Sequence, residues 1–208
     1  MVTPANASFS AAAVSSGSEA SFSSDGSYRW WLRRRLSTGD GCLLYLGLNP
    51  SRADGQRDDP TLRRLIGFTR QWGYQELVVL NLFARISPSP AALLRVKDPI
   101  GEQNDAILNR WLDHWSRTSG IDLWCGWGVN GARWDRAQGV LAAIQRLLPE
   151  RRWSVPASPH PLMLGRTASG QPRHPLYAPR QGCLQPFLWA DPEPIRHPMK
   201  TVTDVLPN

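Results

Sequence analysis

Two asparagines, each at the end of a short apolar run, are the residues of this sequence best placed for binding chemistry. Asn49 follows the run at 43–48, and Asn81 follows the run at 77–80. A carboxamide donates and accepts hydrogen bonds at the same time, as the edge of a nucleobase requires. The same side chain also caps loops, so loop capping is the alternative for both positions.

Aromatic and histidine side chains occur near these asparagines or near later candidate strand ends. Phe83, Trp127 and Tyr177 could stack on a base, although each could equally belong to the core. His160 and His174 both precede a proline, and an imidazole can titrate near neutral pH. A structural role is the alternative for both histidines.

The segment from Gly126 to Gly131 has the glycine spacing of a dinucleotide-binding turn. It follows the third apolar run instead of the first, and no acid ends the following strand to bind a ribose. We interpret it as a turn that lets a helix approach the sheet, with a backbone nest for one phosphate as the alternative. Ser51 lacks the Gly-x-Ser-x-Gly sequence of a hydrolytic nucleophile, which argues against acyl transfer.

The formal net charge is +7, from 24 Lys and Arg against 17 Asp and Glu, and arginine far outnumbers lysine. Arginine suits phosphate groups, so DNA, RNA or a nucleotide-like small molecule is the expected partner, with a solvated basic surface as the alternative. Candidate phosphate contacts are Arg63, Arg64 and the run Arg33 to Arg35. The run could instead protect an edge strand from pairing with another chain.

The three cysteines are scattered and form no Cys-x-x-Cys pair. This pattern argues against a disulfide framework, a zinc site and a four-cysteine iron–sulfur cluster, so we expect a cytoplasmic protein with no metal and no cofactor. No apolar run approaches the roughly 20 residues that span a bilayer, so we expect no membrane partner. The oligomeric state is undefined, and we assume a monomer.

The candidate residues require a framework that brings distant segments together. Apolar runs predict buried strands at 43–48, 77–80, 121–125 and 153–157. Amphipathic stretches predict helices between them, the first with Asp59 as N-cap and Pro60 at its first position, the second from about 101 to 116 and the third after Gly131. This alternation predicts a parallel sheet, whose strand ends should bring Asn49, Asn81, the 126–131 turn and His160 to one edge.

The ends of the chain differ from its centre. Residues 1–27 are rich in Ser and Ala, contain no Lys or Arg and show no sustained period, so we expect a disordered and dispensable tail without a targeting signal. Residues 28–36 predict an antiparallel edge strand. We expect one domain at 28–180 and an irregular, proline-rich tail at 181–208.

Several motifs lie in the central region: Leu-Asn-Pro-Ser-x-Ala-Asp (48–54), Asp-Asp-Pro-Thr-x-Arg-Arg (58–64), Gly-Phe (67–68), Trp-Gly-Tyr (72–74), Val-x-Asn-Leu-Phe-Ala (79–84), Asp-Pro-Ile-Gly (98–101), Trp-Gly (127–128) and Gly-x-Pro-Arg-His-Pro-Leu-Tyr (170–177). Together they resemble an uncharacterised, mainly bacterial family, domain of unknown function 1643. The resemblance covers roughly residues 28–179 and implies no activity.

A weaker resemblance is to the uracil-DNA glycosylase superfamily. The motif at 47–50 is similar to the Gly-Ile-Asn-Pro after the first strand of mismatch-type glycosylases, and 79–81 is similar to the strand end whose asparagine reads uracil. The motifs at 127–128 and 159–161 fall where that superfamily has Trp-Gly and a late His-Pro-Ser. Leu162 replaces the serine, and no catalytic Asp follows Gly47. The resemblance implies a three-layer α/β/α sandwich with a four-stranded parallel sheet, to which the N-terminal antiparallel edge strand would be added.

These observations predict a cleft for a nucleobase or nucleotide, in which any reaction would be hydrolysis of an N-glycosidic bond. Asn49 would position water, and His160 or His174 would steady charge on the departing base. The candidate binding residues are Pro50, Ser51, Asp54, Asn81, Phe83, Trp127, Gly128, Arg173 and Tyr177. One alternative is a non-catalytic nucleic-acid or nucleotide-binding module, which the weak basicity of amides and neutral histidine favours. Another is a hydrolase of a small phosphorylated substrate, with Asp54, Asp58 and Asp59 as acids.

Overall fold

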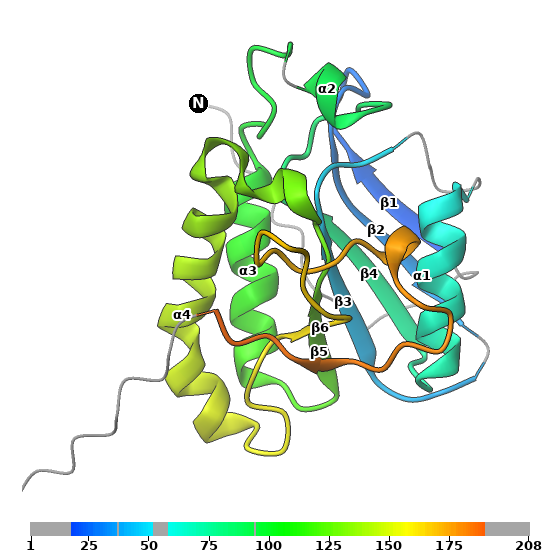
Figure 1. Cartoon of the computed structure of the whole chain (residues 1–208), viewed down its shortest axis with the longest axis vertical. Helices are drawn as coiled ribbons and strands as arrows, with labels where there is room; N and C mark the ends of the chain where they lie inside the picture. The colour runs from blue at the N-terminus through cyan, green and yellow to red at the C-terminus, as the bar shows by residue number, and fades with distance from the viewer. Residues whose placement is uncertain (1–17, 37, 52–57, 94, 190–208) are drawn as a thin grey trace, which may run out of the picture.

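The computed structural model describes residues 18–36, 38–51, 58–93 and 95–189. They fold as a mixed α/β protein around one seven-stranded sheet with the strand order β1-β2-β4-β3-β5-β6-β7 (Figure 1). The strands are β1 (Ser18–Phe22), β2 (Arg29–Arg35), β3 (Cys42–Gly47), β4 (Glu76–Asn81), β5 (Ile121–Cys125), β6 (Leu162–Met163) and β7 (Gln185–Pro186). The helices are α1 (Pro60–Gln71), α2 (Pro90–Leu93), α3 (Asn104–Arg117) and α4 (Arg136–Ser154), with 3₁₀ turns η1 (Val129–Asp135) and η2 (Pro175–Tyr177).

The middle of the sheet is parallel and its flanks are antiparallel. β4, β3, β5 and β6 run side by side in one direction, whereas β1, β2 and β7 pair antiparallel with their neighbours. The three predicted strands at 43–48, 77–80 and 121–125 are confirmed as β3, β4 and β5. The sequence predicted four parallel strands and one antiparallel strand. The described part of the chain instead has three antiparallel strands, β1, β2 and β7, beside the parallel ones.

Helices cover both faces of the sheet. Leu43 and Tyr45 of β3 pack on the side of α1, and Leu44 and Leu46 pack on the side of α3 and α4. Figure 1 shows α1 on one side of the sheet and α3 with α4 on the other. Burial on both faces explains why the central strands are continuous apolar runs without polar alternation.

The first helix starts as predicted. The side chain of Asp59 accepts a hydrogen bond from the Leu62 backbone N–H at 2.6 Å, and Pro60 occupies the first turn. Proline is tolerated there because the first backbone N–H groups of a helix have no intrahelical acceptor. The start of α1 is therefore fixed beside the loop that follows β3.

The predicted strand at 153–157 is wrong. Helix α4 continues through Pro149 to Ser154, and the fourth parallel strand is the two-residue β6. The reason is Arg151, whose fully buried guanidinium donates to the backbone oxygens of Trp115, Ile121 and Ser158. This side chain fastens the last turn of α4 to the end of α3 and the start of β5. His160 consequently precedes a strand instead of following one.

Within the described residues, the sheet extends beyond the expected domain bounds of 28 and 180 at both ends. β1 lies within the segment expected to be disordered and pairs along β2, with Glu19 opposite Arg33, so β2 is not the edge strand. At the other end, β7 pairs with β6, and Phe187 is buried in the core. Residues 1–17 and 190–208 lie outside the described residues.

The helices of the described residues are short or polar. None of them is long and apolar enough to cross a membrane.

The role of Arg151 predicts a large loss of stability on its removal. Arg151→Met should lower the free energy of unfolding by about 3 kcal/mol or more, because several buried carbonyl groups would lose their donor. The adjacent, exposed Arg152 is the matched control, and Arg152→Met should change the free energy by less than about 0.5 kcal/mol. Urea denaturation of both variants measures the difference. Equal effects would show that Arg151 does not fasten α4.

Candidate functional site

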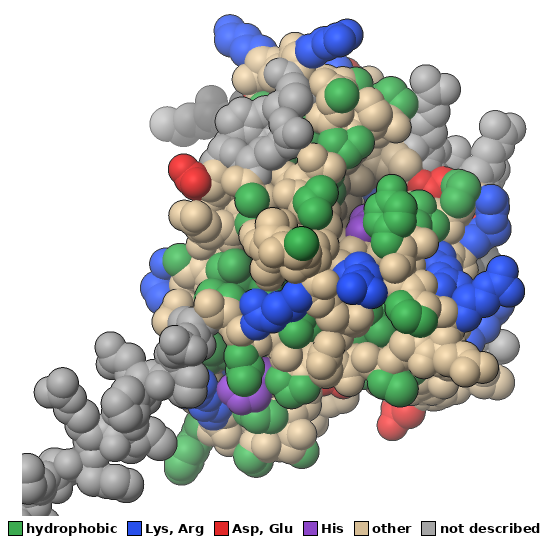
Figure 2. All heavy atoms as spheres, in the orientation of Figure 1, with side chains coloured by type: hydrophobic (Ala, Val, Ile, Leu, Met, Phe, Trp, Pro, Cys, Tyr) green, Lys and Arg blue, Asp and Glu red, His purple; other side chains and the backbone are tan. Residues whose placement is uncertain are grey.

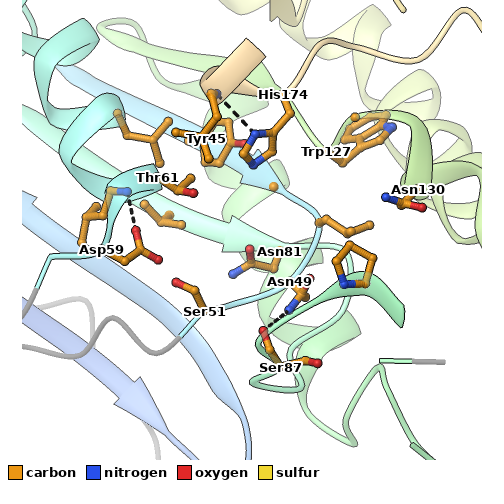
Figure 3. Close-up of a pocket in the computed structure, with 18 of the residues that line it drawn as sticks. Tyr45, Asn49, Ser51, Asp59, Thr61, Asn81, Ser87, Trp127, Asn130 and His174 are labelled. Carbon is orange, nitrogen blue, oxygen red and sulfur yellow. Dashed lines mark hydrogen bonds between the residues drawn. The ribbon is translucent and has the colours of Figure 1, made fainter. Parts of the chain in front are cut away.

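A cavity of about 570 Å³ lies at the carboxyl ends of the parallel strands. Its walls come from the ends of β3 and β4, the turn after β5, the first turns of α1 and the segment at 167–177. Figure 3 shows side chains from these separate segments around one space. Cavities of this size accept small molecules in many proteins, so the volume suits a small-molecule ligand.

The structure brings most of the sequence-predicted residues together. Those that line the cavity are Asn49, Ser51, Asn81, Trp127, Gly128, Arg173, His174 and Tyr177. Those absent from its described lining are Pro50, Phe83, Arg63, Arg64 and His160. Asp54 lies outside the described residues. The predicted meeting of strand ends therefore holds for Asn49, Asn81 and the 126–131 turn, and it is wrong for His160.

Asn81 is a buried polar side chain of the cavity wall with an unsatisfied donor. It is 3% exposed, and its Nδ2 has no hydrogen-bond partner among the described residues. A Cβ added at Gly47 would lie 3.1 Å from Asn81 Oδ1, so the amide oxygen sits over that glycine. A buried donor without a partner costs about 1–3 kcal/mol. The unpaired Nδ2 therefore marks a place where a ligand acceptor would restore a lost hydrogen bond.

The amide nitrogen of Asn49 is hydrogen-bonded within the protein, and its amide oxygen has no hydrogen bond among the described residues. Its Nδ2 donates to the backbone oxygens of Pro50 at 2.9 Å and Ser87 at 3.1 Å. Loop capping is thus confirmed for the amide nitrogen, which has only two hydrogens to give. What Asn49 can still offer a ligand or a water molecule is its acceptor, Oδ1.

The hydrogen bonds of His174 define which ring nitrogen carries the proton. Nδ1 accepts from the Leu176 backbone N–H at 3.3 Å, so the neutral ring carries its hydrogen on Nε2. Burial lowers the pKa of His174 below 6.5, and the Asp59 carboxylate opposes this shift. His174 therefore offers the cavity an Nε2–H donor at neutral pH.

The glycines of the 126–131 turn leave room for side chains of the protein, whereas the sequence predicted a turn that lets a helix approach the sheet. A Cβ at Gly126 would lie 2.6 Å from a ring carbon of Tyr45, and one at Gly131 would collide with the indole of Trp127. Gly128 has φ +72°, beside His174. The glycines make room for two large side chains of the protein itself.

Of the three aromatic residues expected to stack on a base, Tyr177 is the accessible one. Phe83 is 1% exposed and belongs to the core, so its predicted stacking role is wrong. Trp127 is also buried, and its Nε1 donates to Gln171 Oε1 at 2.7 Å. Tyr177 is 80% exposed and lines the cavity. It is the aromatic side chain of the described wall most open to a ligand.

The candidate phosphate-binding arginines are engaged with the protein. Arg33 and Arg35 pair with Glu76, and Arg34 pairs with Asp58 at 2.9 Å. These contacts give the run a structural role as ion pairs, although β2 has a neighbour on each side and the expected protection of an edge strand does not apply.

The two arginines on α1 are engaged in the same way. Arg63 donates to the Asp58 backbone oxygen, and Arg64 to that of Ala178. Phosphate contact therefore has no support at 63 or 64.

Two cavity residues, Arg29 and Asp59, were not among the predicted binding residues. Phe22 pairs with Arg29 and Ser21 with Trp31, so Trp30 is the extra residue of a β-bulge. Such bulges re-aim neighbouring side chains, and Arg29 lines the cavity from this position. Burial lowers its pKa to about 10, opposed by Asp59.

The sequence contained a usable signal for one of these residues. The sequence predicts Asp59 as an N-cap and as one of three possible acids. The N-cap of a helix that follows a parallel strand lies at the ligand-binding edge of the sheet, and this position is the signal that points to Asp59. For Arg29 no comparable signal exists, because the bulge depends on the pairing of β1.

Within the described residues, no group of three or more His, Cys, Asp or Glu side chains could hold a metal ion.

The fold and the cavity define an α/β protein with a candidate small-molecule site at the carboxyl ends of its parallel strands. The family model described as "Protein of unknown function (DUF1643)" matches residues 29–176, so the chain belongs to this family. Neither the curated proteins nor the solved structures gave a match.

The lowered pKa of His174 predicts a pH dependence of stability. The unfolded chain takes up a proton on this residue first as the pH falls below about 6.5, so stability is present above that pH and is lost as the pH falls toward the folded pKa. His174→Asn keeps an acceptor for the Leu176 N–H and removes the titration. Urea denaturation between pH 8 and 5 should therefore give a shallower loss in the variant; identical slopes would contradict the assignment.

Proposed function

We propose that this protein binds a nucleobase or nucleotide in the cavity and hydrolyses an N-glycosidic bond there. The observation that carries the proposal is the buried Nδ2 of Asn81, which points to a ligand acceptor. Carbonyl oxygens and ring nitrogens of nucleobases are such acceptors.

The resemblance to uracil-DNA glycosylases supports the same function. The two asparagine-containing motifs that carry it end neighbouring parallel strands, and Gly47 pairs with Asn81 in the register of β3 and β4. Asn49, Asn81 and Trp127 all line the cavity. A glycosylase-type three-layer sandwich with four parallel strands at its centre is the fold that we propose on this basis.

Each polar group of the wall has a defined hydrogen-bonding role in this proposal. Asn81 Nδ2 donates to the base edge, and Asn49 Oδ1 accepts from the attacking water. The Nε2–H of His174 faces negative charge that develops on the departing base, where a fixed donor lowers the barrier. Tyr177 stacks at the mouth of the cavity.

A non-catalytic nucleotide-binding module is the second candidate. It is favoured by the chemistry of Asn49, Asn81 and His174, because neither amides nor an imidazole whose Nε2 is protonated accepts a proton readily. The third candidate, a hydrolase of a phosphorylated substrate, has less support. Asp58 pairs with Arg34 outside the described cavity lining, and Asp54 lies outside the described residues.

The partner that delivers the base is either nucleic acid or a free nucleotide. Figure 2 shows several Lys and Arg side chains on the face crossed by the segment at 162–189, and few acidic ones. Arg173 differs from Arg63 and Arg64 because it lines the cavity. One of its terminal nitrogens, Nη2, donates to the Arg166 backbone oxygen at 3.2 Å, and we propose that the other guanidinium donors contact a phosphate at the mouth. We propose DNA or RNA as the partner on this basis, in the cytoplasmic compartment that the cysteines predict.

Replacement of the two asparagines tests the binding function. Asn81→Ala should weaken the binding of nucleobases or nucleosides at least tenfold, about 1.4 kcal/mol, with little loss of stability because the donor has no protein partner. Asn49→Ala should cost about 0.5–2 kcal/mol of stability, since its amide caps the loop, and should abolish base release while sparing base binding. Calorimetry and release from oligonucleotides that contain uracil, hypoxanthine or a mismatch measure these effects.

Asn109, exposed on α3, is the matched control. Asn109→Ala should change neither binding nor release. Nucleobase affinity that is unaffected by Asn81→Ala would reject the site, and Asn81-dependent binding without base release by the wild type would favour the non-catalytic module.

The salt dependence of oligonucleotide binding tests the partner. If a phosphate contacts Arg173, Arg173→Gln should reduce the slope of log affinity against log salt by about one. Arg35→Gln, whose parent side chain pairs with Glu76, should leave the slope unchanged. Binding that is insensitive to salt in the wild type would reject the nucleic-acid partner and leave a small-molecule cavity.

A further inference from the structure

The proposed hydrolysis needs a group that accepts a proton from water, and the asparagines and histidines predicted for this reaction supply none. We propose that Asp59, at the N-terminus of α1, is this group. The inference rests on the proposed function and names a catalytic residue beyond the asparagines and the histidine.

The neutral side chains of the described wall are unsuited to the role. Amide groups such as those of Asn49 and Asn81 are too weakly basic. Nδ1 of His174 is occupied by the Leu176 N–H and Nε2 carries the hydrogen, so the ring can only donate. The Tyr45 hydroxyl donates to the Gly126 oxygen at 2.7 Å, and burial raises its pKa well above 10.

The charged side chains leave one candidate. Arg29 and Arg173 have no acceptor atom. Asp59 is the only carboxylate among the described residues that line the cavity. Asp58, next to it in sequence, is directed to Arg34 instead. Elimination over the described wall therefore points to a single side chain.

The orientation of Asp59 suits this task. One carboxylate oxygen accepts from the Leu62 backbone N–H at 2.6 Å, which anchors the group to the first turn of α1. Figure 3 shows the other oxygen directed into the space between Ser51 and Asn81. The electrostatic effect of Asp59 on both Arg29 and His174 also places its charge within the site. An anchored carboxylate with one oxygen toward the ligand space can orient and deprotonate a water molecule.

The reaction balances with the residues present. The water oxygen forms a bond to the sugar carbon while the bond from that carbon to the base nitrogen breaks, and its electron pair leaves with the base. The Asp59 carboxylate takes the proton of the water, and the Nε2–H of His174 stabilises the departing base by a hydrogen bond. The base then takes up a proton, directly or through solvent, from the carboxylic acid of Asp59, which restores the carboxylate.

Asp59→Asn tests this role without removing the helix cap, because Asn and Asp are similarly good N-cap residues. In single-turnover assays with the oligonucleotide that the wild type processes, base release should fall about 10²- to 10⁴-fold. Base affinity and melting temperature should stay near those of the wild type. Asp58→Asn is the matched control, and it should retain base release per folded molecule even if it lowers stability.

Formate rescue provides a readout that a structural role would not move. Asp59→Gly costs only a few tenths of a kcal/mol at an N-cap and opens space for a small carboxylate. Added formate should restore part of the base release of Asp59→Gly and should not accelerate the wild type. Rescue together with a slow Asp59→Asn variant supports the proposal.

Three outcomes would overturn the proposal that Asp59 accepts the proton of water. Rapid release by Asp59→Asn would remove Asp59 from catalysis and leave the proposed hydrolysis in place. Loss of release in Asp59→Asn without formate rescue of Asp59→Gly would make Asp59 a structural residue. An absence of release by the wild type across the oligonucleotide panel would reject hydrolysis itself, and Asp59 catalysis with it, even where Asn81-dependent binding persists.

Discussion

The geometry of the site depends on the burial of Tyr45 between two glycines. A Cβ at Gly47 would lie 2.8 Å from one side of its ring, and a Cβ at Gly126 would lie 2.6 Å from the other. The ring also meets Trp124 edge-on, and its hydroxyl donates to the Gly126 oxygen. Side chains larger than hydrogen at either strand end would therefore displace the ring. With glycine at both positions, the Tyr45 ring fits against the ends of β3 and β5 and forms part of the cavity wall.

The protein fixes the backbone around Asn81 and leaves its side chain unsatisfied. Nδ2 of Asn104 donates to the backbone oxygens of Asn81 and Leu82, and Nε of Arg136 donates to that of Leu82. The strand end is thus held from the α3 and α4 side, and burial of the Asn81 side chain restricts the positions that its amide can take. A donor that is fixed before the ligand arrives loses little entropy on binding.

Local patterns predicted the elements with strong sequence signals. The apolar runs located β3, β4 and β5, and the Asp59-Pro60 pair located the start of α1. What failed depended on distant contacts. The extension of α4 relies on hydrogen bonds that Arg151 makes to α3 and β5, and β6 is too short to show a period. The same limit applied to the site: strand ends placed Asn49 and Asn81, whereas Arg29 enters only through a bulge opposite β1.

In the proposed function, Asn81 Nδ2 donates a hydrogen bond to a bound base. A crystal structure of the protein soaked with nucleobases and nucleotides tests this hydrogen bond. We expect a base in the cavity with a carbonyl oxygen or ring nitrogen at about 2.9 Å from Asn81 Nδ2, and the Nε2–H of His174 toward a second acceptor. A base that binds elsewhere, or that occupies the cavity without contact to Asn81, would rule out this role of Asn81.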